Sequence, residues 1–141
     1  MADGSTKAGG ASAIRPAPLS PHVQVWRWHV TMAASIQTRG TGVALYVGLL
    51  IIAWGALALA NGQDAYGTFV SIMSSWLGRI VLFGITVSIF YHLAAGLRHL
   101  AWDTGKGFQP KTANLTAVAA MAFGIAAALV VWFIAMITGG A

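Results

Sequence analysis

Two histidines inside an apolar stretch are the residues with the most evident chemical potential. The segment from Phe90 to Asp103 reads FYHLAAGLRHLAWD, and His92 and His99 lie seven residues apart in it. Seven residues are two turns of an α-helix, so both imidazoles fall on one helix face. The same face also carries Ser88, Gly96 and Asp103. Because a polar stripe is costly against hydrocarbon, it has to face another helix, water or a cofactor.

The chemistry that suits this stripe is ligation of a haem iron, since a neutral imidazole in a dry helix bundle is a common axial ligand. Gly96 follows His92 by one turn and removes a side chain where a flat ring could approach. His92 lies about 15 Å inside the end of its expected helix, whereas His99 lies near the membrane interface. His92 is therefore the predicted ligand, with a simple hydrogen bond to a neighbouring helix as the alternative. For His99 a structural or solvated role is favoured.

A hydroxyl and a cation share a face of an earlier helix. Ser35 and Arg39 are four residues apart, just where a long apolar run begins. A guanidinium at that depth has two interpretations. It is an anchor that reaches the lipid headgroups, or it acts with Ser35 on a carbonyl oxygen or carboxylate at the membrane surface.

The composition supplies the setting for these side chains. The chain has 141 residues, of which 57% are hydrophobic and 8% charged, whereas soluble domains have about 25% charged residues. Three apolar runs each approach the roughly 20 residues that cross a bilayer. We expect an all-α integral membrane protein with transmembrane helices at about residues 31–60, 77–102 and 114–138. So small a bundle predicts a partner subunit. The absence of cysteine excludes disulfides, iron–sulfur ligation and thiol catalysis by this chain.

The net charge of +5 indicates topology rather than nucleic-acid binding. Of the 8 lysines and arginines, all but Arg79 lie before or at the start of the first span or around the connection between the second and third spans. The positive-inside rule places the N-terminus and that connection in the cytoplasm. No arginine precedes Arg15, which favours the bacterial inner membrane over the mitochondrial inner membrane.

The segments outside the spans also have expected conformations. Residues 1–14 should be a disordered tail, and residues 15–30 a cytoplasmic or interfacial segment that begins with the extended run RPAPLSP. The sequence NGQDAY at residues 61–66 predicts a turn, and residues 68–76 a surface helix. The sequence TGKGFQP at residues 104–110 predicts a second turn.

Two blocks of sequence resemble a known family. They are RPAPLSPHVQVWRWHVTMAASIQTRGTG at residues 15–42 and YHLAAGLRHLAWDTGKG at residues 91–107. Together they resemble the cytochrome b membrane-anchor subunit of succinate dehydrogenase, the succinate:quinone oxidoreductase of respiratory complex II. The specific pieces are S-P-H, S-I-x-x-R-G-T-G and H-x-x-x-G-x-R-H-x-x-W-D. The resemblance covers nearly the whole chain after Arg15.

The resemblance implies three transmembrane helices that pack with a second anchor subunit around haem b. Succinate is oxidised at FAD on a flavoprotein subunit, and electrons pass through the clusters of an iron–sulfur subunit to ubiquinone. This chain is then part of an enzyme but is not catalytic alone. The resemblance further implies that Ser35 and Arg39 contact the quinone, with Ile36 and Trp28 as apolar lining.

For the haem, the resemblance implies that His92 is one axial ligand and that the second anchor subunit supplies the other. Arg39, Arg98 and His99 fall on the haem-propionate side. Thr38 stands where the family usually has a histidine close to a propionate, so that contact is expected to be missing.

Three other interpretations remain open at this point. The chain could anchor a fumarate reductase that runs in the reverse direction, because direction depends on potentials and on the quinone. It could also be a purely structural anchor that binds neither haem nor quinone. A small transporter subunit would need polar residues along a pathway, and the third span offers none.

Overall fold

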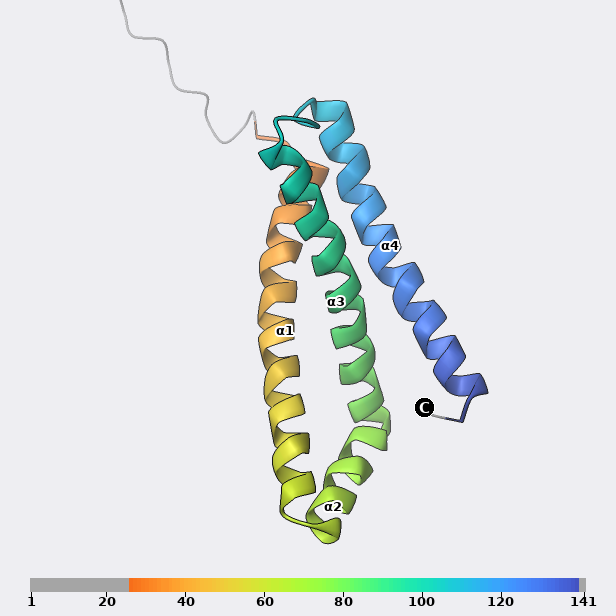
Figure 1. The fold of residues 1–141 in the computed structure, drawn as a ribbon. Coiled ribbons are helices and arrows are strands. Elements are labelled where there is room, and N and C mark those ends of the chain that lie inside the picture. Colours follow the sequence, from red (N-terminus) through yellow and green to blue (C-terminus); the bar gives the residue numbers. More distant parts are fainter. Residues whose placement is uncertain (1–25, 140–141) are drawn as a thin grey trace, which may run out of the picture.

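The computed structural model describes residues 26–139, which form four α-helices. They are α1 (Val30–Ala60), α2 (Gln63–Ser74), α3 (Trp76–Asp103) and α4 (Pro110–Ile137). The three long helices run side by side in alternating directions, and the short α2 lies where the chain turns from α1 into α3 (Figure 1). The expected disordered tail and the run RPAPLSP fall outside the described residues.

The two ends of the bundle differ in charge. We call the end that carries the α3–α4 turn the basic end, because the basic residues at or near it are Arg27, Arg39, Arg98, Lys106 and Lys111. The opposite end, which carries α2, is called the α2 end.

The connection between α1 and α2 is shorter than the sequence predicted. Only Asn61 and Gly62 lie outside the helices, so NGQDAY is not a six-residue turn and α2 already begins at Gln63. Gly62 has φ 103°, a conformation that glycine adopts without strain. It lets the chain leave α1 and enter α2 across only two residues. Asp64 in the first turn of α2 favours this early start, because a carboxylate complements the positive end of the helix dipole.

The two later helices have clear start signals. The Ser75 side chain accepts a hydrogen bond from the backbone N–H of Gly78 at 3.2 Å and so caps α3. Pro110 occupies the first turn of α4, where the missing N–H of proline costs nothing. The proline expected to end a turn therefore begins a helix, and α4 starts before the predicted boundary near residue 114.

α3 lies at the centre of the bundle and packs against both α1 and α4. Tyr91, Ala95 and Ala120 form the buried cluster between α3 and α4. The buried residues of α4 are Ala117, Ala120, Gly124 and Ala128. These small residues lie on one face of α4, and they let its backbone approach α3 closely.

Most large apolar side chains point out of the bundle. The three long helices are each long and apolar enough to cross a membrane. In the most apolar 18-residue stretch of each helix, only 11–17% of the residues are buried inside the bundle. Such a surface is stable only against lipid or another membrane helix. The prediction of an all-α membrane protein with three spans is confirmed for residues 26–139.

Candidate functional site

His92 is half-buried in the middle of α3 and is held by a contact from α1. Its Nδ1 atom lies 3.2 Å from the hydroxyl of Thr41, a residue that is only 9% exposed. The Thr41 hydroxyl also donates to backbone carbonyl oxygens of its own helix, Gln37 at 2.9 Å and Thr38 at 3.1 Å. Within the described part of the chain, the other ring nitrogen, Nε2, has no hydrogen-bond partner.

An open apolar groove lies beside this imidazole. It has a volume of about 580 Å³ and is lined by Leu45, Ile89, His92, Leu93, Gly96, Leu97 and Leu100. His92 is the only ionisable residue in this lining. A Cβ atom on Gly96 would meet nothing within 4 Å, so the glycine keeps the floor of the groove open. We call this feature the His92 groove.

A second pocket lies at the basic end and joins α1 to α3. It has a volume of about 330 Å³ and is lined by Thr31, Ser35, Thr38, Arg39, Arg98, His99 and Trp102. Four residues predicted for the site, Ser35, Arg39, Arg98 and His99, thus share one pocket. Two guanidinium groups line it, and no carboxylate does. We call this feature the basic-end pocket.

Two residues predicted as apolar lining lie elsewhere. Ile36 is 53% exposed and Trp28 is 61% exposed, and neither lines the basic-end pocket. Trp28 instead stands edge-to-face with Trp26, with 5.7 Å between the ring centroids. The side chains of Ile36 and Trp28 are therefore available to a neighbouring subunit or to lipid.

Arg98 and His99 are already partly engaged by the protein. Arg98 Nε donates to the Thr116 hydroxyl at 3.1 Å, and a terminal nitrogen donates to the carbonyl oxygen of Ala113 at 3.2 Å. The guanidinium also lies 4.0 Å above the ring of Trp102. His99 Nδ1 donates to the carbonyl oxygen of Ala95, which leaves Nε2 as a hydrogen-bond acceptor.

Thr38, where the family resemblance leads us to expect a histidine, links α1 to α3. Its hydroxyl lies 3.0 Å from the hydroxyl of Tyr91 and donates to the carbonyl oxygen of Ala34 at 2.9 Å. Tyr91 is 1% exposed and donates to the same carbonyl oxygen at 2.8 Å. The polar atom at this position is thus used for helix packing, although Thr38 still lines the basic-end pocket.

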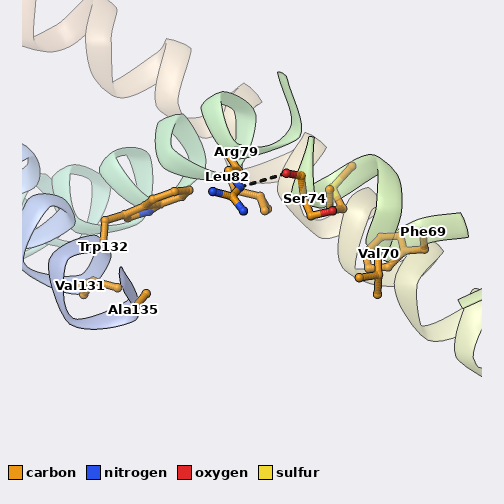
Figure 2. A pocket seen from close by; sticks show the side chains of 9 residues that line it. Phe69, Val70, Ser74, Arg79, Leu82, Val131, Trp132 and Ala135 are labelled. Carbon is orange, nitrogen blue, oxygen red and sulfur yellow. Dashed lines mark hydrogen bonds between the residues drawn. The ribbon is translucent and has the colours of Figure 1, made fainter. Parts of the chain in front are cut away.

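A third pocket lies at the α2 end, far along the bundle from the basic-end pocket. Its volume is about 280 Å³, and its walls are mostly apolar side chains of α2, α3 and α4. Figure 2 shows Arg79 in this pocket, with its Nε bonded to the carbonyl oxygen of Ser74 at 3.0 Å. None of the predicted site residues lines it.

Sequence reasoning missed the role of Thr41 and the two further residues Thr31 and Trp102. Thr41 lies inside the quoted run S-I-x-x-R-G-T-G, but only the rotation of α1 about its axis decides that its hydroxyl meets His92. No local pattern encodes a contact between residues 51 positions apart. Among residues 26–139 no three histidine, cysteine, aspartate or glutamate side chains gather as a metal site.

Fold and site together define a multi-pass membrane protein that carries one histidine over an apolar groove and a cationic pocket at one end. Known proteins narrow this class. The family described as succinate dehydrogenase/fumarate reductase transmembrane subunit matches residues 14–131. The chain belongs to this family. With its three apolar helices it is a multi-pass inner-membrane protein and an anchor subunit of the succinate dehydrogenase type.

Individual relatives agree with this assignment. The succinate dehydrogenase cytochrome b556 subunit of Paracoccus denitrificans is 39% identical over 120 residues, which cover 83% of this chain and 92% of the relative. The b556 subunit of Rickettsia felis is 34% identical over 115 residues, 82% of this chain and 90% of the relative. The mitochondrial cytochrome b560 subunit of Sus scrofa is 42% identical over 94 residues, but the match spans only 54% of that relative.

Proposed function

We propose that this chain is the cytochrome b membrane anchor of a succinate:quinone oxidoreductase. It binds haem b together with a second anchor subunit and forms part of the ubiquinone-reduction site. The observation that carries the proposal is His92, a residue of a membrane helix that lines an open apolar groove and whose Nδ1 lies 3.2 Å from the Thr41 hydroxyl.

The residues of the His92 groove fit a haem. Iron needs an imidazole nitrogen with a free lone pair, and Nε2 of His92 is the nitrogen without a partner among residues 26–139. A porphyrin needs apolar walls, and the rest of the groove is glycine and aliphatic side chains. When bound, the haem supplies a one-electron carrier within the membrane. The names of the relatives, cytochrome b556 and b560 subunits, agree with this donor set.

The first test replaces His92 by alanine in the assembled complex. Because the substitution deletes the iron ligand, the reduced-minus-oxidised spectrum of the purified complex should lose most of its haem b signal. The copurifying subunits show whether the complex still assembles. An unchanged haem spectrum in an assembled complex would refute the assignment.

Quinone reduction is assigned to the basic-end pocket. Arg39 and Ser35 are both exposed on α1 and line the same pocket, so they can donate hydrogen bonds to one carbonyl oxygen of a quinone headgroup. A fixed cation at that oxygen stabilises the negative charge that develops during reduction. His99 offers an acceptor nitrogen in the same pocket, and Arg98 adds a second positive charge. Ile36 and Trp28, which lie outside the pocket, would contact the isoprenoid tail or a partner subunit.

Replacing Arg39 by alanine separates this role from a structural one. The variant should lose most succinate:quinone reductase activity while it keeps succinate oxidation by a soluble dye, because the flavin and the iron–sulfur clusters lie on partner subunits. Arg79→Ala, which removes the cation at the α2 end, is the matched control and should keep both activities. Unchanged quinone reductase activity in Arg39→Ala would contradict the assignment, whereas equal loss of both activities would indicate failed assembly.

The proposal includes the other subunits of such a complex. A second anchor subunit would cover the His92 groove and supply a second iron ligand, and an iron–sulfur subunit would dock at the basic end with a flavoprotein subunit behind it. Lys106 lies in the α3–α4 turn and Lys111 in the first turn of α4, so by the positive-inside rule we assign this end and the N-terminus to the cytoplasm of a bacterium.

The family description also names fumarate reductase, and this keeps the reverse reaction as a second candidate. Direction is set by the potentials of the carriers and of the quinone, which the anchor influences without determining. Steady-state rates with succinate plus ubiquinone and with fumarate plus a reduced quinone decide between the two. A dominant fumarate rate would reverse the proposed direction.

A further inference from the structure

Among residues 26–139, Thr41 is the side chain that makes a hydrogen bond with the proposed haem ligand. Its hydroxyl lies 3.2 Å from His92 Nδ1, across the interface between α1 and α3. The next residue, Gly42, is also close to the ring, because a Cβ atom added to it would lie 3.7 Å from His92 Cε1, which is ordinary contact distance.

The direction of this hydrogen bond follows from the other contacts of the hydroxyl. A threonine hydroxyl has one proton and two lone pairs. The backbone carbonyl oxygens of Gln37, at 2.9 Å, and Thr38, at 3.1 Å, can only accept hydrogen bonds, so we assign the hydroxyl proton to them. The contact to His92 must then use a lone pair of the hydroxyl, so Nδ1 carries a hydrogen and donates it. A neutral imidazole with a proton on Nδ1 has its free lone pair on Nε2.

We propose that Thr41 is a positioning residue that fixes the tautomer and the ring orientation of His92, so that Nε2 faces the groove as an iron ligand. The inference rests on the proposed haem function and deepens it. Partners of the second ring nitrogen of a metal-bound histidine generally orient the ring and raise its basicity. Thr41 performs this task with a neutral hydroxyl, which is itself held by the α1 backbone.

Two substitutions test the hydroxyl in the assembled complex. Thr41→Val keeps the shape of the side chain but removes the acceptor, and Thr41→Ser keeps the hydroxyl and serves as the matched control. Removing the hydrogen-bond partner of a metal-bound histidine typically lowers the affinity for the metal by about 10–100-fold. We expect Thr41→Val to lose haem to an apoglobin scavenger faster by a factor in this range, and Thr41→Ser to behave as the unmodified complex does.

The haem midpoint potential gives a readout that a merely structural role would not move. An imidazole without a partner for its Nδ1 hydrogen donates less electron density, which favours ferrous over ferric iron. Thr41→Val should therefore raise the potential, and each tenfold change in the ferrous-to-ferric preference corresponds to about 59 mV for one electron. Thr41→Ser should restore the original value. An assembled Thr41→Val complex with the original potential and the original rate of haem loss would overturn the proposal.

Assembly and the proposed function are controlled separately. If Thr41→Val does not assemble, Thr41→Ala, which has high helix propensity and little bulk, is measured in the same way. Nitrogen-15 NMR of the unmodified, histidine-labelled complex needs no variant, and an unprotonated Nδ1 on His92 would overturn the proposal. If His92→Ala retains its haem, the proposed function itself is refuted. If haem is lost in His92→Ala but haem loss and potential are unaltered in Thr41→Val and Thr41→Ala, only the proposed role of Thr41 is refuted.

Discussion

Replacing Gly124 by alanine should force α3 and α4 apart next to the proposed ligand. A Cβ atom on Gly124 would lie 2.8 Å from Cβ of Tyr91, and 3.0 Å from both the Cα and the backbone nitrogen of Tyr91. Non-bonded carbon atoms pack at about 3.5–4.0 Å, so the helices must separate by roughly 1 Å at this point. Because the obstacle is largely backbone, no side-chain rotation relieves it. Overpacking of this kind costs about 1–3 kcal/mol.

The displacement should also reach the site, because Tyr91 is the neighbour of His92 in α3. Gly84→Ala is the matched control, since a Cβ atom on Gly84 would meet nothing within 4 Å. Alanine is favoured over glycine in a helix by up to about 1 kcal/mol, so the control should be neutral or slightly stabilised.

The assay is thermal unfolding of the detergent-solubilised complex, followed by tryptophan fluorescence, with haem content measured in parallel. Gly124→Ala should unfold several degrees below Gly84→Ala and release its haem earlier in the temperature ramp. Equal unfolding temperatures for the two variants would refute the close approach of α3 and α4 at Gly124.

Three further variants test separate contacts in the same assays. Tyr91→Phe removes the hydroxyl that donates to the carbonyl oxygen of Ala34 at 2.8 Å, and it should cost about 0.5–1.5 kcal/mol of stability. Because the Tyr91 and Thr38 hydroxyls also contact each other, the losses of Tyr91→Phe and Thr38→Val should not add in the double variant. Strict additivity would contradict this shared hydrogen bond. Arg98→Met removes two hydrogen bonds between α3 and α4 and should cost about 1.5–3 kcal/mol of stability. Arg98→Lys should not restore this stability, because lysine lacks the forked guanidinium group. An unfolding temperature equal to that of the unmodified complex would contradict a stabilising role of these two bonds. Gly96→Leu fills the floor of the His92 groove and should lower haem content while dye-linked succinate oxidation persists, whereas full haem content would place the ring elsewhere.

Much of the fold was predictable because the signals are local. Three apolar runs of membrane-spanning length fixed the number of spans, and the structure places helices Val30–Ala60, Trp76–Asp103 and Pro110–Ile137 over them. The turn after α1 was mispredicted for an equally local reason. Polar residues such as Gln63 and Asp64 are typical of turns, yet in the first turn of a helix they are also well tolerated.

The site was only partly accessible from the sequence. Helix periodicity put Ser35 and Arg39 on one face, and the structure places both in one pocket with Arg98 and His99. Periodicity within one helix says nothing about how α1 is rotated against α3. The partners of His92 and Thr38 could therefore not be predicted, although each side chain is linked to the facing helix by one hydrogen bond.

The most direct test is a density map of the complete complex at a resolution that shows side chains. We expect a flat porphyrin density in the groove lined by Leu45, Leu93 and Gly96, joined to His92 at Nε2, with Nδ1 facing Thr41. A groove filled by lipid chains or by a helix of another subunit, with His92 bonded only to protein, would contradict it.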